Sequence, residues 1–381
     1  MRNSFLYLAL SALIFSSFIC AEEISTEANP TPSIQPTPKN YHFIYGADFN
    51  FFLDNLEESQ TYNWPTRTLF AASIFPEIGL SFYNQNLKIG GYAIADMGQG
   101  YPKNGGFTIS YDFTYKNLRG IFGIFSKKEW IGNYSNLFYR KDYLYYHPVS
   151  NGILFQYQPK DKNIIGELMV DWYGGNRAKG FDEFLVQGYF EKNFFHRALY
   201  FGGSLLLYHF LNHDFLSQDG AIYEGKPDTY LLDRFYYQIF IGTDLTHLAP
   251  VMDTLKIQMS NLSSLERKRT HSQGVEPFNN LLGWQFDFNA QYKGFGIDNS
   301  TYFGASQYRY FNQYGENFYA GLPFYQSPFY NRTEIYYEFK NPYLTTRFSV
   351  IFHFTDRNIA NQEMLTLVLD SHKLFKRLFT Q

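Results

Sequence analysis

The chain has almost no cysteine. Cys20 is the only one among 381 residues, and it lies at the end of an N-terminal segment that has the three parts of a secretory signal. Arg2 is the positive end, residues 5–19 form an apolar run, and Ala21 is a small residue at which cleavage is expected. The predicted mature chain then has no cysteine, which excludes a disulfide-stapled fold. A lipid on Cys20 is the alternative, but Ile19 occupies a position where lipoprotein signals have a small residue.

Long apolar runs and a strong net charge are also lacking. After the signal, no segment has the roughly 20 uninterrupted apolar residues of a transmembrane helix, and a long apolar stretch at 198–208 contains glycine. Any membrane crossing must therefore be made by strands. The formal net charge of −3 at pH 7 gives no support to a nucleic-acid partner. No phosphate-binding glycine loop or zinc cysteine pair is present, so we predict no cofactor.

Aromatic residues are abundant instead, at 21% of the chain. In residues 107–116, apolar or aromatic positions alternate with polar ones without a break. The same period of two recurs at 284–293 and at 347–354, where Ile351 is the one break on the polar side. This period predicts β-strands with one apolar and one polar face. Behind a signal peptide, we expect the apolar face to meet lipid and the polar face to line a lumen.

Three parts are predicted along the chain. They are a signal peptide at 1–21, a disordered linker rich in Pro, Ser and Thr at 22–40, and a membrane barrel at 41–381. Strand-like segments of the third part number about seventeen, among them 138–146, and because bacterial barrels have even strand counts we expect about 16, in a range of roughly 14–18.

Connections between the strand-like segments come in two lengths, as expected of a barrel with tight turns on one side and long loops on the other. We expect the long set to be extracellular, and 211–232 and 310–328 are the candidates for loops that fold into the lumen. The tight turns are predicted at 117–119, 160–162, 293–294 and 340–342, and a further long loop at 265–280.

The last strand-like segment carries a resemblance to a known family. In residues 365–370, Leu alternates with Thr, Val and Asp, and Phe375 and Phe379 follow. This pattern resembles the closing strand of Gram-negative outer-membrane barrels, although Thr380 and Gln381 follow the final Phe. The resemblance implies a porin-like protein of the bacterial outer membrane. Its implied partners are membrane lipid and lipopolysaccharide, small solutes and the barrel-assembly machinery, with a homo-oligomer left open.

One segment has the residue types of a lipid hydrolase. His147, Ser150, Asn151 and Gly152 resemble the His-x-Ser-Asn-Gly signature of outer-membrane phospholipase A, in which the serine is the nucleophile and the histidine is its base. Here three positions separate His147 from Ser150, so on a regular strand they point to opposite faces. Pro148 also removes a ladder donor between them. A bulge could realign the pair, but we favour a turn that joins two strands.

Charged residues on the polar phase of the strands are the candidates for solute selection, because carboxylates and cations in a constriction sort solutes by charge. Simple solvation of the lumen, or pairing between strands, is the alternative. A basic cluster of Arg267, Lys268 and Arg269 is a candidate contact for anionic lipid or lipopolysaccharide phosphates, with an ordinary solvated loop as the alternative. No metal site is predicted, because the spacing of His209 and His213 suits a helix rather than a strand. The lumen candidates are Asp48, Asp112, Glu167, Asp171, Asp287, Lys293, Arg347 and His353.

The sequence therefore favours an all-β chain that forms a single antiparallel membrane barrel with a lumen wide enough for water. Our main functional prediction is a porin-like channel for passive or weakly selective diffusion of small solutes, without enzyme activity. Two alternatives remain open. One is a phospholipase-like hydrolase that uses Ser150 and His147, and the other is an adhesive or structural surface barrel that transports nothing.

Overall fold

The computed structural model describes residues 41–58, 66–99, 104–173, 183–211, 229–270 and 272–371. The predicted signal peptide, Cys20 and the linker lie outside these ranges, as do Phe375, Phe379 and most of the predicted loop 211–232. None of the helices in the described ranges is long and apolar enough to cross a membrane.

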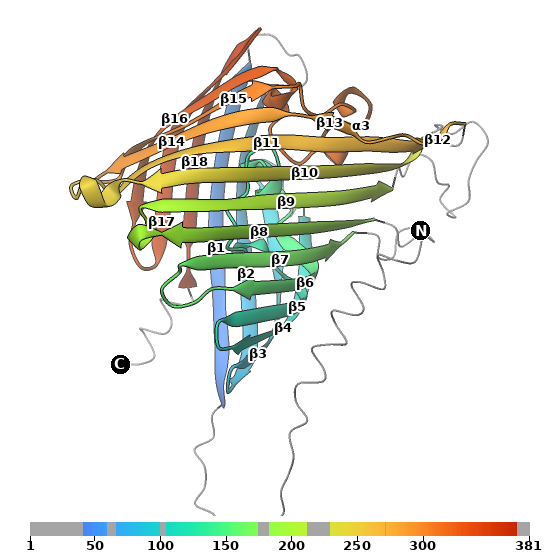
Figure 1. Cartoon of the computed structure of the whole chain (residues 1–381). Coiled ribbons are helices and arrows are strands. Elements are labelled where there is room, and N and C mark those ends of the chain that lie inside the picture. The colour runs from blue at the N-terminus through green and yellow to red at the C-terminus, as the bar shows by residue number, and fades with distance from the viewer. Residues whose placement is uncertain are drawn as a thin grey trace, which may run out of the picture. The chain divides into compact units, whose positions relative to one another are not determined.

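One antiparallel sheet closes on itself to form a barrel (Figure 1). The ring is closed by β1 (Tyr41–Glu58), which pairs with both β2 (Arg67–Phe82) and β18 (Ile359–Leu369). The sheet has 18 strands, but the short β12 and β13 pair with β11 beside β14, so the wall has 16 strands, as predicted. The other strands are β3 (Gln85–Asp96), β4 (Asn104–Tyr115), β5 (Leu118–Ser126), β6 (Val149–Tyr157), β7 (Ile164–Trp172), β8 (Phe184–Phe194), β9 (Leu199–Leu211), β10 (Thr229–Asp244), β11 (Thr254–Thr270), β12 (Gly274–Val275), β13 (Asn279–Leu281), β14 (Gly283–Tyr292), β15 (Phe295–Gly304), β16 (Phe329–Lys340) and β17 (Leu344–Thr355).

The alternation of the sequence sets the two faces of the wall. In β4, Phe107, Ile109 and Tyr111 are exposed on the outer face, whereas Ser110 and Asp112 are buried on the inner face. The same phase holds in β14 and β17. Large exposed apolar side chains lie on most strands of the wall. The prediction of strands with an apolar outer face and a polar inner face is confirmed.

The four predicted tight turns all occur at one end of the barrel, which we call the short-turn end. They join β4 to β5, β6 to β7, β14 to β15, and β16 to β17. In the third of these turns both Lys293 and Gly294 have a positive φ, at 47° and 85°, a geometry that glycine adopts without steric cost. The start of β1 and the end of β18 lie at the same end. We call the opposite end the long-loop end.

Two predictions of local structure are wrong. Residues 138–146, predicted as a strand, contain the helix α2 (Lys141–Tyr146). Phe138, Tyr139 and Arg140 are buried in succession, whereas a strand of this wall alternates between lipid and lumen. Residues 265–280, predicted as a long loop, contain the end of β11 together with β12 and β13. There β11 stays paired with β10 as far as Thr270.

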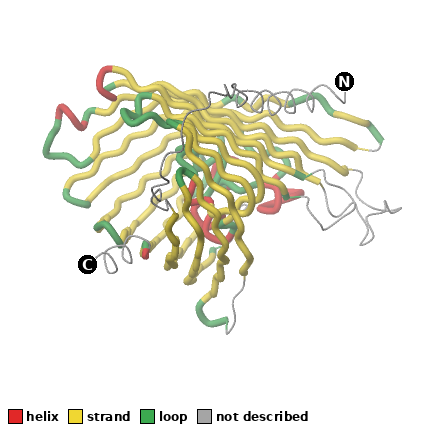
Figure 2. Tube along the Cα trace, turned by 90° about the horizontal axis from the view of Figure 1, so that it is seen from below, coloured by secondary structure: helices red, strands yellow, loops and turns green. Residues whose placement is uncertain are grey.

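Within the described ranges, two connections fold into the barrel, where the strands surround short helices and loop segments (Figure 2). Loop A, residues 127–148, joins β5 to β6, and loop B, residues 305–328, joins β15 to β16. Their side chains form one buried cluster with apolar residues on the inner face of the wall, such as Met169. The inward course of 310–328 is as predicted, whereas that of loop A is not. Beside α2, the part of the chain that the structure describes contains the helices η1 (Lys127–Glu129), η2 (Phe195–Arg197), η4 (Thr246–Leu248), α3 (Phe311–Phe318) and η5 (Pro323–Gln326).

Candidate functional site

Carboxylates on the inner face of the wall hold loop A in place. Asp48 of β1 forms an ion pair with Lys128. Glu167 of β7 accepts hydrogen bonds from the backbone N–H of Ile131 at 2.6 Å and from the Tyr134 hydroxyl at 2.8 Å. Because a carboxylate with two donors is well satisfied away from water, these wall residues fix where loop A crosses the lumen.

Loops A and B bind each other through their backbones. The N–H of Arg140 donates to the carbonyl of Ala320 at 2.9 Å, and the N–H of Leu322 donates to the carbonyl of Asn136 at 2.9 Å. The hydroxyl of Tyr308 donates to the carbonyl of Leu137 at 2.8 Å. The two loops therefore form one structural element across the long-loop half of the lumen.

A network of four charges joins both loops to the wall. Arg140 of loop A contacts Asp142 at 2.9 Å and Glu316 of loop B at 2.7 Å. Arg67 of β2 pairs with the same two carboxylates. Arg140 also donates to the carbonyls of Tyr319 and Gly321. Among the described residues of the network, two arginines stand against two carboxylates, and this pairing favours the burial of Arg140.

A second buried arginine, Arg234 of β10, connects the wall to loop B. It is 1% exposed and donates to the carbonyl of Phe318. Its guanidinium lies 4.8 Å from the Tyr236 ring and 4.9 Å from the Phe318 ring. Nearby, Glu266 of β11 accepts from the hydroxyl of Tyr319 at 2.9 Å. Aromatic faces stabilise a cation that is removed from water, so Arg234 can hold loop B from inside the wall.

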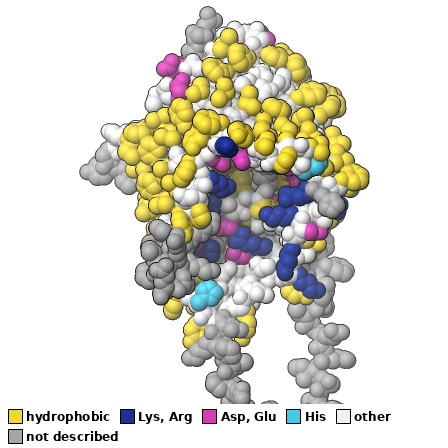
Figure 3. All heavy atoms as spheres, turned by 90° about the vertical axis from the view of Figure 1, so that its left-hand side faces the viewer, with side chains coloured by type: hydrophobic (Ala, Val, Ile, Leu, Met, Phe, Trp, Pro, Cys, Tyr) yellow, Lys and Arg dark blue, Asp and Glu magenta, His cyan; other side chains and the backbone are white. Residues whose placement is uncertain are grey.

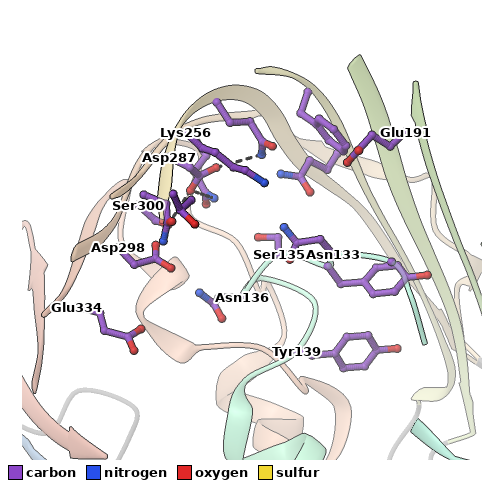
Figure 4. Close-up of a pocket in the computed structure, with 18 of the residues that line it drawn as sticks. Asn133, Ser135, Asn136, Tyr139, Glu191, Lys256, Asp287, Asp298, Ser300 and Glu334 are labelled. Carbon is purple, nitrogen blue, oxygen red and sulfur yellow. Dashed lines mark hydrogen bonds between the residues drawn. The ribbon is translucent and has the colours of Figure 1, made fainter. Parts of the chain in front are cut away.

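A cavity of about 830 Å³ opens between the paired loops and the short-turn end. Figure 3 looks at that end and shows a hollow with many Lys and Arg side chains, some Asp and Glu, and a rim of hydrophobic side chains outside. Loop A contributes Asn133, Ser135 and Asn136, which lie across the cavity from Asp287, Asp298 and Lys256 of the wall (Figure 4). Tyr139 of the same loop points away from these three residues and donates to Gln187 of β8. The charged lining residues are Lys127, Lys128, Lys141, Arg197, Lys256, Arg332 and Arg347, against Glu191, Asp244, Asp287, Asp298, Glu334 and Glu338.

Glu334 of β16 is the centre of the densest group of charges in the cavity wall. It accepts from Arg332 at 2.5 Å, from Arg347 at 2.7 Å and from Ser349 at 2.6 Å, and Lys141 of loop A approaches to 3.5 Å. Arg347 also pairs with Glu338 at 3.6 Å, and Asp298 lines the same wall, so charges of both signs are present there in similar number. Asp287 lies on β14 and accepts from Ser300 of the neighbouring strand at 2.6 Å.

Burial changes the titration of Lys127, which lies in loop A at the edge of the cavity. Desolvation lowers the pKa of its ammonium group to about 8, although the carboxylate of Asp171 acts in the opposite direction. The ammonium lies 5.5 Å from the centres of the Trp130 and Tyr143 rings. Lys127 is therefore charged at pH 7 and loses that charge in mildly alkaline solution.

The predicted lumen residues have different positions. Seven of the eight face inward, but only Asp287 and Arg347 line the cavity. Asp48 and Glu167 bind loop A, Asp112 pairs with Arg119 at 2.7 Å, and Asp171 accepts from the N–H of Asn151 at 2.7 Å. His353 stacks on Phe324 of loop B at 4.3 Å. Lys293 lies in the turn between β14 and β15 rather than on the wall.

Several residues that line the cavity were not among the candidates predicted from the sequence. Arg332 and Glu334 lie on the inner phase of a segment that was recognisable as a strand, so the period of two in 329–340 was the signal that could have found them. Lys127 and Lys141 belong to loop A, whose inward course carries no comparable local signal.

The possible hydrolase pair is separated by the fold. His147 follows α2 at its C-terminal end and stacks on Tyr143 at 4.4 Å. Ser150 begins the inner face of β6 and is fully buried, so it does not lie on the lipid-facing surface. Burial lowers the pKa of His147 to about 4, with Lys127 and Arg140 acting in the same direction. Among the described residues, no hydrogen bond joins His147 to Ser150, and no group of side chains is suited to hold a metal ion.

The predicted basic cluster is divided between the two faces of β11. Arg267 and Arg269 lie on the outer phase and pair with Asp233 of β10. Lys268 lies on the opposite phase, where it approaches Glu276 to 3.6 Å.

No family model and no curated protein matches the chain. Solved structures with a similar course of the chain include Pseudomonas putida OprB at high pH (10% identity, TM-score 0.48, 87% of this chain and 94% of that one). Another is a loop-L8 deletion mutant of OmpT, an outer membrane protein of Vibrio cholerae (8%, TM-score 0.49, 87% and 99%). A third is Pseudomonas aeruginosa OccK2 (OpdF) in complex with glucuronate (9%, TM-score 0.41, 86% and 98%). At such low identities, the function of this chain must be argued from its own residues.

The fold and the site define a class. A closed antiparallel barrel satisfies every ladder hydrogen bond of its wall internally, and its outer face carries large apolar side chains. A wall of 16 strands with short turns at one end is the architecture of bacterial outer-membrane barrels. The protein has the fold of a transmembrane β-barrel of this type.

Proposed function

We propose that the barrel is a porin-like channel through which small polar solutes diffuse, with weak selection by charge. The observation that supports this most directly is the cavity of about 830 Å³, enclosed by the wall and lined by seven cationic and six anionic side chains. Barrels of about this strand number leave room for an aqueous lumen, and charged walls stay solvated only where water has access. The short-turn end faces the periplasm, because outer-membrane barrels have their short turns on that side.

Loops A and B set the width of the pathway. They occupy the long-loop half, so a solute must pass beside them to reach the cavity. The mixed lining opposes neither sign of charge strongly, which supports weak rather than strict selectivity. Lys256 and Asp287 face the same space from neighbouring strands (Figure 4). Neutralising either one should therefore change the electrostatic potential of the cavity, in opposite directions for the two residues.

Conductance in a planar lipid bilayer tests this proposal. The folded protein is expected to give reproducible open steps, and the Asp287→Asn variant should shift the reversal potential in a salt gradient towards anions. Lys256→Gln should shift it towards cations. The matched control is Asp161→Asn, because Asp161 lies in the turn between β6 and β7 and its loss should leave selectivity unchanged.

A silent bilayer that contains verified folded barrel would overturn the channel proposal. The adhesive or structural alternative would then be the better account. If open steps occur but neither cavity variant changes the ion selectivity, the conducting path lies elsewhere in the lumen.

A further inference from the structure

A group of charged side chains lies on the outer face of the barrel at the long-loop end, where the proposed channel does not use it. His209 of β9, Asp233 of β10, and Arg267 and Arg269 of β11 occupy the outer phase of three neighbouring strands. We call these four residues the rim cluster. Charges on this face are unexpected within a lipid-facing surface, so their presence needs a specific reason.

Asp233 organises the rim cluster. One of its oxygens lies 2.6 Å from Nδ1 of His209, and the other accepts from Nε of Arg267 at 2.6 Å and from Nη2 of Arg269 at 3.1 Å. The carboxylate itself is buried, while the side chains of the two arginines remain about a quarter exposed, at 25% and 28%. Two guanidinium groups against one carboxylate leave a net positive charge, held in a fixed place on the outer face.

The arginines keep hydrogen-bonding capacity for a further anion. Each uses only one of its nitrogens on Asp233, and a guanidinium carries five N–H donors. The plane of Arg267 is also fixed by the Phe278 ring, 4.2 Å away. A pair of arginines with defined planes and spare donors suits a phosphate, which guanidinium groups bind in a bidentate manner.

The surroundings of the rim cluster are those of a membrane interface. Trp172 stacks on Phe184 at 5.8 Å, and Phe184 stacks on His209 at 5.2 Å, in a row across the outer face. Further along the same strands, towards the short-turn end, Leu205, Ile239 and Met259 are exposed on the outer face, as are Phe201, Ile241 and Ile257. On β11, the polar residues Asn261 and Ser263 lie between Met259 and the rim cluster on the same phase. A positive site thus lies next to an apolar strip on β9 and β10.

We propose that the rim cluster binds the phosphate of a phosphorylated lipid of the outer leaflet, whose acyl chains lie along the apolar strip of β9 and β10. Charge, hydrogen-bonding geometry and the neighbouring apolar surface favour an amphiphile over a free anion, which would use only the arginines. The sequence pointed to Arg267, Lys268 and Arg269 as a group. The fold assigns the role to Arg267 and Arg269 with His209, and it leaves Lys268 on the other face. The proposal does not depend on whether the lumen conducts.

Lipid titration followed by native mass spectrometry tests the site. The full barrel in detergent is titrated with diphosphorylated lipid A, and bound lipid is counted for the wild type and for Arg267→Gln with Arg269→Gln. We expect the double variant to bind at least about tenfold more weakly, since each basic residue at a membrane surface contributes to anionic-lipid affinity. Lys268→Gln is the matched control and should bind as the wild type does. Heat-modifiable migration in gel electrophoresis shows that each variant is folded.

Two comparisons separate the possible sources of the phosphate. Dephosphorylated lipid A should bind the wild type weakly, and inorganic phosphate at millimolar concentration should not displace lipid A. Displacement by inorganic phosphate, or equal binding by the double variant, would overturn the proposal. If the double variant does not fold, Arg267→Lys with Arg269→Lys keeps the charge but loses the planar donors. A clear loss of lipid A binding in that variant would support the site, and an unchanged affinity would overturn it.

Discussion

The two halves of the barrel interior use charge in different ways. In the long-loop half, Arg140 and Arg234 are buried against carbonyls, carboxylates and aromatic rings, and each holds an inward loop. In the short-turn half, Lys256, Asp287 and their neighbours surround open space. Both sets of charged residues belong either to inward-facing positions of the strands or to the loops that fold inward. What distinguishes them is whether a loop covers them, so the course of loops A and B decides which charges are structural and which can act on a solute.

The largest effect should come from breaking the network between the loops. Arg140→Gln removes the cation that joins Asp142, Glu316 and two carbonyls of loop B. Loss of a buried, hydrogen-bonded charge destabilises a protein by about 3–5 kcal/mol, and the separated loops should give larger or noisier conductance steps. Urea unfolding in lipid vesicles and single-channel recording measure the two effects.

Arg357→Gln is the control for this change. Arg357 lies in the exposed connection between β17 and β18 and pairs with Asp356 at 3.4 Å. An exposed pair contributes up to about 1 kcal/mol. If Arg140→Gln unfolds at the same urea concentration as the wild type and conducts identically, the loops are not held by this network.

A smaller effect is expected at Arg234, which supports the loop-filled half but does not line the cavity. Arg234→Met keeps most of the side-chain volume but loses the hydrogen bond to the carbonyl of Phe318 and the stacking on the aromatic rings. We expect a loss of about 2 kcal/mol in the free energy of unfolding with unchanged ion selectivity. A shift in selectivity without a loss of stability would contradict the division between the two halves.

The pH response of the cavity should be moderate. Because burial lowers the pKa of Lys127 to about 8, its positive charge is present at pH 7 and is lost as the pH rises through that value. Selectivity should then shift towards cations between about pH 7 and 9, as measured by reversal potentials. Lys127→Met should remove this transition. Lys128→Met should retain it, because Lys128 pairs with Asp48 and its pKa is raised despite burial.

The smallest effect is expected at Ser150. Its side chain is fully buried on the inner face of β6, so Ser150→Ala should change the free energy of unfolding by less than about 1 kcal/mol. Hydrolysis of phospholipid by the variant should equal that of the wild type. A specific loss of hydrolysis in the folded variant would instead restore the hydrolase alternative.

The wall was predictable from sequence because its signal is local. The alternation in residues 107–116 indicates both that the segment is a strand and which side chains face the lipid. Lys293 and Gly294 mark a tight turn. Loop A was not predictable in the same way, because Phe138, Tyr139 and Arg140 are buried by contacts with loop B that no local pattern encodes. Ile351 gave a weaker signal for an inward loop, because it is an apolar residue among the polar positions that face the lumen. This residue is buried in a small cluster against which Tyr145 of loop A packs.

The candidate site was only partly predictable for a related reason. Sequence period identifies which charges face inward, and it does so for Asp48, Glu167 and Asp287. It does not say which inward charges are covered, because that depends on register and on the loops. As a result, Asp48 and Glu167 were placed with Asp287 as selectivity candidates, although the first two bind loop A.

The contacts between the two loops also constrain the order of assembly. Arg140 and Tyr319 are 179 residues apart, and Leu137 and Tyr308 are 171 apart. Contacts of such long sequence separation form late, because the chain between them must first be ordered. Here that intervening chain supplies the wall strands from β6 to β15, which make up half of the wall. A nascent barrel therefore has an unobstructed interior while its strands are being added, and its constriction forms only when the wall is nearly complete.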